Sequence, residues 1–390
     1  MKFPNESELR ARHTRKWTEY DDDVLPLYVA ESDFCTAPTV KKTIQDFVER
    51  ECFGYSPAVH ASTLPTDVAQ FQATRYGWKV DPEKVFWISD VVRGMLLGIE
   101  HFTRPGSPVI CPLPAYPPFL ELPIAAGRER IDILASPVNG VRAPGQPGEL
   151  DLDAIEKAFA AGAGSIMLAN PFNPLGYVFK EDFLTKLVEL ADKYDARILS
   201  DEIHAPLVYD GTHIPVASLS ETAARVTITV TATSKAWNFA GLKCAQIIFS
   251  NDDDAATWKR IENVRKDGVG TLGIVAAEAA YRDGGEFLDE EVAYLRETRD
   301  WIVKELPARI PGLKTAHPDA TYLLWLDFRD TAIGHLERPA AWLVEHARVA
   351  LNEGATFGDI GKGQARLNFA TSREILEEAI NRIASAIAAV

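Results

Sequence analysis

Cysteine is scarce in this sequence, and long apolar runs are missing from it. The 390 residues include four cysteines, none of which forms a C-x-x-C pair: Cys35, Cys52, Cys111 and Cys244. Such spacing encodes neither a disulfide framework nor a zinc site, so we expect a reducing compartment and no metal. No segment approaches the roughly 20 apolar residues that a membrane helix requires. We therefore expect a cytoplasmic protein with no membrane partner.

Basic charge is also in deficit. The chain has 41 lysines and arginines against 56 aspartates and glutamates, a net charge of −15. An overall negative field works against the phosphates of nucleic acids, so we expect a small-molecule partner and no nucleic acid. The hydrophobic share of 46% and charged share of 25% are typical of globular proteins and exclude a fibrous or disordered chain.

From Lys84 onward, apolar segments of strand length alternate with helical segments. Examples are KVFWISD at 84–90, SIMLAN at 165–170 and ARILSD at 196–201. This alternation indicates βαβ units, and the continuous apolar runs indicate buried parallel strands. We predict an α/β protein with a large, mostly parallel-sheet domain at 49–285 and a smaller α+β domain at 286–390. Residues 1–48 are expected to form an arm and a helix that pack with the small domain.

The run TVTATSKAWNFAGLK at 229–243 carries the clearest chemical signal. Lys235 follows an apolar strand, with the hydroxyls of Thr233 and Ser234 before it and a second cation, Lys243, after Gly241. A lone lysine there would more simply extend to solvent. Here the second cation and either hydroxyl could bind a phosphate, while Lys235 forms an imine with a carbonyl of the same ligand. A phosphorylated aldehyde bound by lysine indicates pyridoxal 5'-phosphate.

Three further residues suit that cofactor, and each follows a predicted strand. Asp201 could keep the pyridine nitrogen protonated, Asn173 could donate to the phenolic oxygen, and Tyr116 could cover the ring face. Open α/β sheets bind their ligands at the carboxyl ends of strands. Together with Lys235, these residues predict one site at that edge of the sheet.

These motifs also resemble a known family. The chain is similar to the fold type I pyridoxal phosphate enzymes, the aspartate aminotransferase superfamily, in four segments: NPFNPLG (170–176), SDEIHAPLVYDG (200–211), SKAWNFAGLK (234–243) and ARLNFA (365–370). Six further segments resemble the cystathionine beta-lyase branch, the carbon–sulfur lyases of the MalY and PatB type: VAESDF (29–34), FGYS (53–56), PAYPPF (114–119), HIPVASLS (213–220), TYLLWLDF (321–328) and ALNEGATFG (350–358). The resemblance implies a three-layer αβα cofactor domain.

The resemblance also implies roles for individual residues. Val91 and Val92 match a helix start whose backbone N–H groups hold the phosphate, in keeping with the anion preference of helix N-termini. Arg366 matches the arginine that grips the substrate's α-carboxylate. Tyr55 matches a tyrosine that crosses a dimer interface to the phosphate, which implies a homodimer with shared sites. Asn173 and Tyr55 are further substrate contacts.

Two positions depart from the commoner pattern of the superfamily. His204 stands where many members have a tyrosine, and it either contacts the cofactor or packs behind the strand. Lys243 stands where many have an arginine, and a lysine lacks the rigid fork that grips phosphate. Lys235, Asp201 and Tyr116 are the predicted catalytic residues.

The branch-specific segments favour elimination over transfer. The predicted reaction cleaves L-cystathionine or another cysteine S-conjugate to a thiol, pyruvate and ammonia. An aminotransferase shares every step up to removal of the α proton and is the alternative, as is a lyase with an added regulatory binding role.

Overall fold

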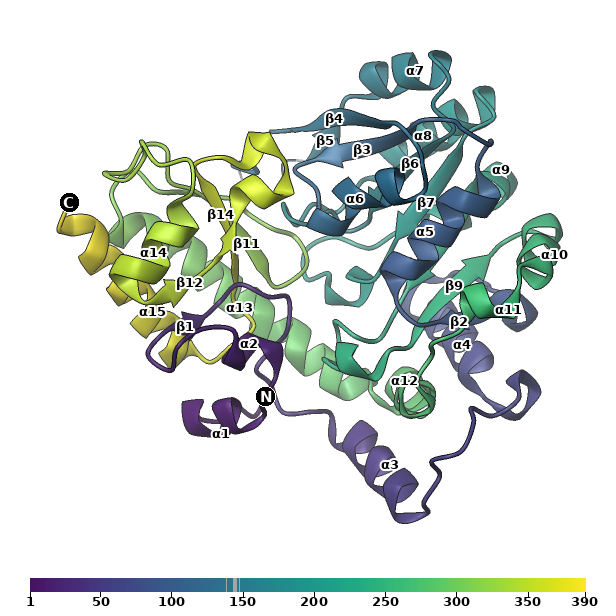
Figure 1. The fold of residues 1–390 in the computed structure, drawn as a ribbon, viewed down its shortest axis with the longest axis horizontal. Helices are drawn as coiled ribbons and strands as arrows, with labels where there is room; N and C mark the ends of the chain where they lie inside the picture. The colour runs from purple at the N-terminus through teal and green to yellow at the C-terminus, as the bar shows by residue number, and fades with distance from the viewer. Residues whose placement is uncertain (138, 143–145, 147) are drawn as a thin grey trace.

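A computed structural model describes residues 1–137, 139–142, 146 and 148–390 of the chain. In this described part, no helix is both long and apolar enough to cross a membrane. In the described residues the strands form a sheet of eight strands, a sheet of four and a pair of short strands, with helices around them (Figure 1).

The large sheet, which we call the central sheet, has eight strands in the described residues. In spatial order they are β2 (Val85–Ile88), β9 (Ala245–Phe249), β8 (Thr227–Thr231), β7 (Arg197–Asp201), β6 (Ser165–Ala169), β3 (Val109–Leu113), β4 (Arg130–Ser136) and β5 (Glu149–Leu150). Neighbours from β8 to β4 pair in parallel, whereas β2, β9 and β5 pair antiparallel. Strands β3, β6, β8 and β9 bury every residue, as the continuous apolar runs predict.

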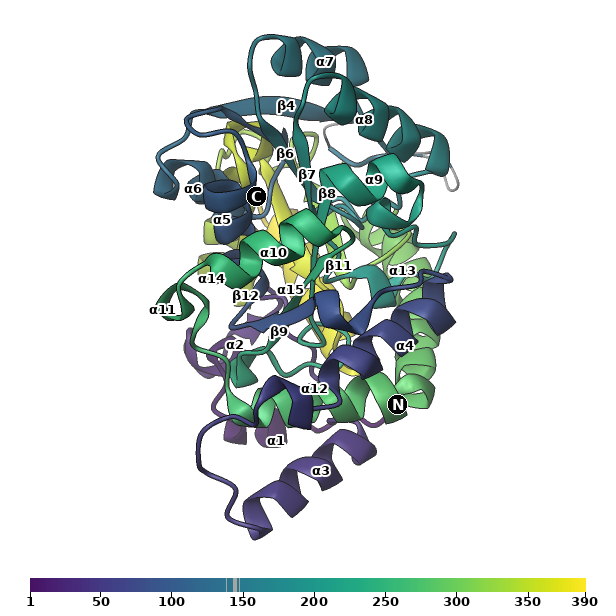
Figure 2. The same ribbon diagram turned by 90° about the vertical axis from the view of Figure 1, so that its right-hand side faces the viewer.

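Helices cover both faces of the central sheet. In Figure 2 the sheet lies between α5 (Val91–Phe102) and α6 (Pro117–Ala125) on one side and α8 (Glu181–Lys193) and α9 (Glu221–Val226) on the other. Helix α7 (Leu152–Ala160) is a further covering helix. Two glycines let α5 pack closely against strands β8 and β7 of the central sheet. A Cβ on Gly94 would lie 2.8 Å from Val230, and a Cβ on Gly98 would lie 3.1 Å from Leu199. The predicted three-layer α/β fold is confirmed.

The small sheet has the order β10 (Lys314–Thr315), β11 (Leu323–Asp327), β14 (Gln364–Asn368) and β13 (Asn352–Glu353), with antiparallel pairing. The N-terminal residues join this half of the molecule through β1 (Leu25–Pro26), which pairs with β12 (Val349–Ala350). The remaining helices are α1 (Glu6–Ala11), α2 (Arg15–Thr18), α3 (Pro38–Glu49), α4 (Leu64–Tyr76), α10 (Asp252–Arg260), α11 (Asn263–Lys266), α12 (Thr271–Asp283), α13 (Gly285–Arg309), α14 (Pro339–Ala347) and α15 (Arg373–Ala388).

Helix α3 differs from the expectation for residues 1–48. It packs against α12, which falls in the range predicted for the large domain, and buries Val40 and Phe47. The arm before it pairs with β12 through β1. The difference arises because α3 has its own apolar face, which α12 covers. The division at residues 48 and 285 remains a prediction.

Candidate active site

The carboxyl ends of the parallel strands bring the predicted residues together. Asp201 ends β7, in register with Ala169 of β6 and Val230 of β8. Lys235 follows β8 and Asn173 follows β6, while Tyr116 lies between β3 and α6. Because these strands end at one edge of the central sheet, their following residues converge there, which is where such sheets bind ligands.

Lys235 and Asp201 form the charged centre of this edge. Burial, together with the positive charge of Arg366, lowers the pKa of Lys235 to about 8. Burial raises the pKa of Asp201 to about 7, against the opposing effects of the Ile203 N–H, which donates to Oδ1 at 3.1 Å, and the nearby Lys235. Each group therefore has a pKa close to neutral pH. Residues that transfer protons in catalysis often have such pKa values.

Arg366, on β14, reaches this centre from the small sheet. Its side chain is 2% exposed, and its Nη1 donates to Oδ1 of Asn173 at 3.1 Å. Nη2 donates to the carbonyl of Tyr28 at 3.3 Å, and the guanidinium lies 4.9 Å from the ring centroid of Phe357. Nε is buried without a partner among the described residues, and burial lowers the pKa of Arg366 to about 10. A buried cation with a donor to spare suits an anionic ligand.

His204 and Tyr116 complete the surroundings of Lys235. His204 is buried, and its Nδ1 has no partner in the described part of the chain. Burial, with the positive charges of Lys235 and Arg366, lowers the pKa of His204 well below its usual value, so the imidazole is neutral. Burial raises the pKa of Tyr116, whose phenol also responds to the charges of Arg366 and Asp201. These couplings place both rings at the same site as the charged centre.

The predicted phosphate residues gather at the start of α5. Val91 and Val92 are its first two residues, and their N–H groups meet no acceptor among the residues described. Nearby, Lys243 Nζ lies 3.0 Å from Oδ2 of Asp90, the residue that caps this helix. Thr233 is fully buried with no partner for its hydroxyl within the described chain, whereas Ser234 is partly exposed. The structure thus leaves donors unpaired at a helix N-terminus, where an anion binds most favourably.

Sequence reasoning missed one part of this site, the arm segment (residues 28–33). The carbonyl of Ala30 accepts hydrogen bonds from Lys235 Nζ at 2.8 Å and from the hydroxyl of Tyr322 at 3.1 Å. Asn368 Nδ2 donates to the carbonyls of Val29 and Glu31, both at 2.7 Å. Only the VAESDF resemblance marked this stretch, and it carried no role, because the contacts use backbone atoms.

The arm segment is fixed at its far end by two further groups. Asn238, with a left-handed φ of 58°, accepts from the Ser32 N–H at 2.9 Å and donates to the Ser32 carbonyl at 2.7 Å. Asp33 accepts from Lys16 Nζ and from the indole N–H of Trp17, both at 2.8 Å, with the side chains of Lys16 and Asp33 almost fully buried. A buried, fully bonded ion pair holds the segment in one position.

One predicted residue does not join the site. The side chain of Tyr55 is fully exposed, at 105% of the reference area, so it makes no contact with the chain's own Lys235. It lies between α3 and α4, in a loop that projects from the body of the molecule (Figure 1).

The sequence of this chain was compared with models of known protein families. Residues 22–383 match the model of the aminotransferase class I and II family. The chain belongs to that family. The match covers both sheets and every predicted site residue, including Lys235, Asp201 and Arg366, so the predicted family is confirmed.

Three proteins that are similar to this chain show which members of the family it resembles. The chain is 53% identical to a cystathionine beta-lyase of Corynebacterium glutamicum, over 99% of this chain and 100% of that one. A Corynebacterium diphtheriae structure assigned as a PLP-dependent beta-cystathionase is 54% identical, with a TM-score of 0.95 over 100% and 99% of the two chains. Cystalysin of Treponema denticola, whose structure contains pyridoxal 5'-phosphate, is 26% identical, with a TM-score of 0.90 over 100% of both chains.

Proposed function

We propose that this chain is a pyridoxal phosphate-dependent carbon–sulfur β-lyase. Its reaction cleaves L-cystathionine and related cysteine S-conjugates to a thiol, pyruvate and ammonia. The observation that carries this proposal is the Lys235 amine, held with a lowered pKa at the strand ends beside a buried carboxylate. The 53% identity to a cystathionine beta-lyase supports the choice of elimination.

The unpaired groups at the site fit the cofactor. Asp201 offers a carboxylate oxygen that accepts no hydrogen bond from the described residues, as a protonated pyridine nitrogen requires. His204 Nδ1 and the Thr233 hydroxyl are buried without partners in the same part of the structure. Buried polar groups are normally satisfied, so these two, which follow strand ends of the central sheet, are available to contact a ligand there.

The residues divide the remaining work. Lys235 would bond the cofactor's aldehyde carbon, and Val91, Val92 and Lys243 would hold its phosphate. When bound, pyridoxal phosphate supplies an electron sink for the negative charge that develops at the substrate's α carbon. Asp201 keeps that sink effective by holding a proton at the pyridine nitrogen.

The substrate's amine would replace Lys235 at the aldehyde carbon, and the freed Lys235 Nζ would then be the base that takes the α proton of the substrate. A base must be neutral, and at a pKa of about 8 roughly a fifth of Lys235 is neutral at about pH 7.4, against about one part in a thousand at the ordinary pKa of 10.5. Arg366 would bind the α-carboxylate through its guanidinium, whose Nε has no partner among the described residues, and this would fix the Cα–H bond relative to Nζ. Loss of the thiolate from the β carbon would leave a three-carbon fragment, which water hydrolyses to pyruvate and ammonia.

Elimination and amino transfer are separated by one assay. Purified protein loaded with pyridoxal phosphate should form pyruvate, ammonia and homocysteine in equal amounts from L-cystathionine, without any 2-oxoacid. Lys235→Ala should form none. Amino transfer to an added 2-oxoacid, with no pyruvate in its absence, would establish the aminotransferase instead.

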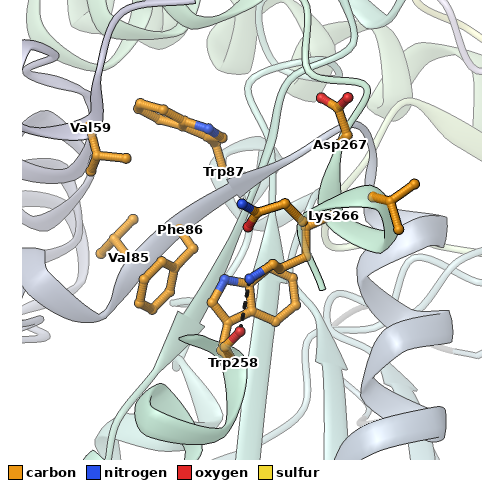
Figure 3. A pocket seen from close by; sticks show the side chains of 9 residues that line it. Val59, Val85, Phe86, Trp87, Trp258, Lys266 and Asp267 are labelled. Carbon is orange, nitrogen blue, oxygen red and sulfur yellow. Dashed lines mark hydrogen bonds between the residues drawn. The ribbon is translucent and has the colours of Figure 1, made fainter. Parts of the chain in front are cut away.

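We also propose that two copies of the chain share their sites. The fully exposed Tyr55 lies in a loop that also exposes Phe53 (68%) and Val59 (55%). This loop adjoins a groove of about 520 Å³, which is lined on its other side by α11. Figure 3 shows Val59, Val85 and Trp87 around the groove, with Lys266 and Asp267 opposite.

A second copy is the occupant that these residues favour. Monomeric proteins rarely expose large apolar side chains in one place, and Val264 of α11 is a further one at 84%. A twofold interface would cover this surface in both copies and carry Tyr55 toward the partner's site. Sedimentation of the purified protein should therefore give twice the chain mass of 43.0 kDa.

A further inference from the structure

Asp90 stands out at the proposed phosphate site because it carries the same sign of charge as the ligand. It caps α5, and its Oδ1 accepts from the N–H of Arg93 at 2.9 Å. The free N–H groups of Val91 and Val92 lie in the same helical turn. A carboxylate and a phosphate bound there repel each other at short range.

Asp90 also forms an ion pair with Lys243, the cation that would otherwise bind the phosphate. Its Oδ2 lies 3.0 Å from Lys243 Nζ, with the two side chains 39% and 57% exposed. The backbone of Lys243 is fixed in a left-handed conformation, with φ of 53°, by a hydrogen bond from the N–H of Gly270 to its carbonyl at 3.0 Å. The side chain of Lys243 thus reaches Asp90 from a backbone position that this hydrogen bond holds.

We propose that Asp90 competes with the cofactor's phosphate for Lys243 and thereby weakens cofactor binding, so that the cofactor exchanges readily. This inference rests on the proposed function and concerns the affinity for one part of the ligand. A half-exposed ion pair contributes little to holding a lysine in place, whereas a carboxylate beside a dianion opposes binding directly. The repulsion therefore outweighs any help that Asp90 gives by orienting Lys243.

The test compares Asp90→Asn with the wild-type chain. Asparagine caps helices as well as aspartate, so the hydrogen bond to Arg93 is kept while the charge is removed. We expect the dissociation constant of pyridoxal 5'-phosphate, titrated into cofactor-free protein by absorbance, to fall about tenfold at low salt, and less at about 0.5 M salt because of screening.

Two controls isolate the phosphate. Pyridoxal, which has the aldehyde and ring but no phosphate, should bind wild type and Asp90→Asn equally. Asp151→Asn removes the same charge from another helix cap, where Oδ1 of Asp151 accepts from the Ala154 N–H at 3.0 Å, and should leave both affinities unchanged. Equal tightening for pyridoxal, or weaker binding of the phosphorylated form, overturns the proposal.

A second variant tests the competition itself. Lys243→Gln removes the contested cation, so adding Asp90→Asn to it should tighten cofactor binding by only about threefold, from the direct repulsion that remains. A full tenfold gain in that background would show that Asp90 does not act through Lys243.

The proposed function is checked separately, by locating the cofactor after borohydride reduction of the wild-type protein. Reduced cofactor on Lys235 supports that function whatever the Asp90 variants do. Its absence from Lys235 rejects the proposed function and, with it, this inference.

Discussion

Replacing Asp201 with asparagine should stabilise the cofactor-free chain while it destroys activity. Asp201 is 8% exposed, and burial raises the pKa of its carboxyl from 3.8 to about 7. A raised pKa in an acid means that the unfolded chain releases the proton more readily than the folded one. Folding stability is therefore lost as pH rises from about 4 to about 7, and the whole loss is present above that range.

The size of this effect follows from the two pKa values. One tenfold change in an ionisation constant is worth about 1.4 kcal/mol, so the shift from 3.8 to about 7 amounts to about 4 kcal/mol. Asparagine carries no charge and can still accept the hydrogen bond from the Ile203 N–H. For a chain of 390 residues, the gain corresponds to a rise in Tm of about 5 °C.

The assay is thermal unfolding of cofactor-free wild type and Asp201→Asn at two pH values. At pH about 8.5 Asp201 is charged and Lys235 is mostly neutral, so the variant should show nearly the full gain. At pH about 4.5 the folded carboxyl is protonated, and the gain should shrink to about 1 kcal/mol. With pyridoxal phosphate bound, the order should reverse, because the pyridine nitrogen loses its ionic partner and pyruvate formation falls with it. A variant less stable at the higher pH, or equally stabilised at both, refutes this account of the site.

Four other changes have defined outcomes. Lys235→Ala should leave no cofactor fixed to the protein after borohydride reduction, as peptide mapping would reveal; label on any other lysine contradicts the assignment. Arg366→Lys loses the paired donors to the α-carboxylate, about 2 kcal/mol, so the KM for L-cystathionine should rise about 30-fold with a smaller change in kcat; an unchanged KM would exclude this carboxylate role. Lys16→Met leaves the Asp33 carboxylate buried and unpaired, so thermal unfolding should show a loss of about 3–5 kcal/mol, which the added change Asp33→Asn should largely restore; a stable single variant speaks against the buried pair. Mixing Tyr55→Phe with Lys235→Ala chains should recover about a quarter of wild-type activity, because half of the dimers contain one intact site; hybrid dimers that form without recovery of activity would show that Tyr55 belongs to the site of its own subunit or to no site.

The residues at strand ends were predictable from the sequence because their signal is local. An apolar strand followed by a polar side chain marks Asp201, Asn173 and Lys235, and parallel strands bring such positions to one edge whatever their separation along the chain. Arg366 came only from the resemblance, since a single arginine within an apolar strand does not show where its side chain points. The structure adds its contact with Asn173.

The contacts that were missed involve partners with no sequence pattern. The carbonyl of Ala30 meets Lys235 because β1 pairs with β12, a contact between residues more than 300 positions apart. The pairing of Asp90 with Lys243 was equally hidden, because Lys243 was predicted to bind the phosphate and no sequence pattern marks Asp90 as its partner. Helix α3 was assigned to the wrong neighbour for the same reason: an apolar face shows that a helix packs, and not what it packs against.

The arm segment contributes carbonyl oxygens to the site, and every amino acid has one. Alanine scanning is therefore blind to it, since no exchange of the Ala30 side chain removes the oxygen that Lys235 meets. A substitution at this position keeps the oxygen in place as long as the path of the backbone is kept. The side chains that hold this path are Asn238 and Asn368. Substitution of Asn238 or Asn368, which both lie outside the reacting centre, is therefore the way to change the hydrogen bond between Ala30 and Lys235.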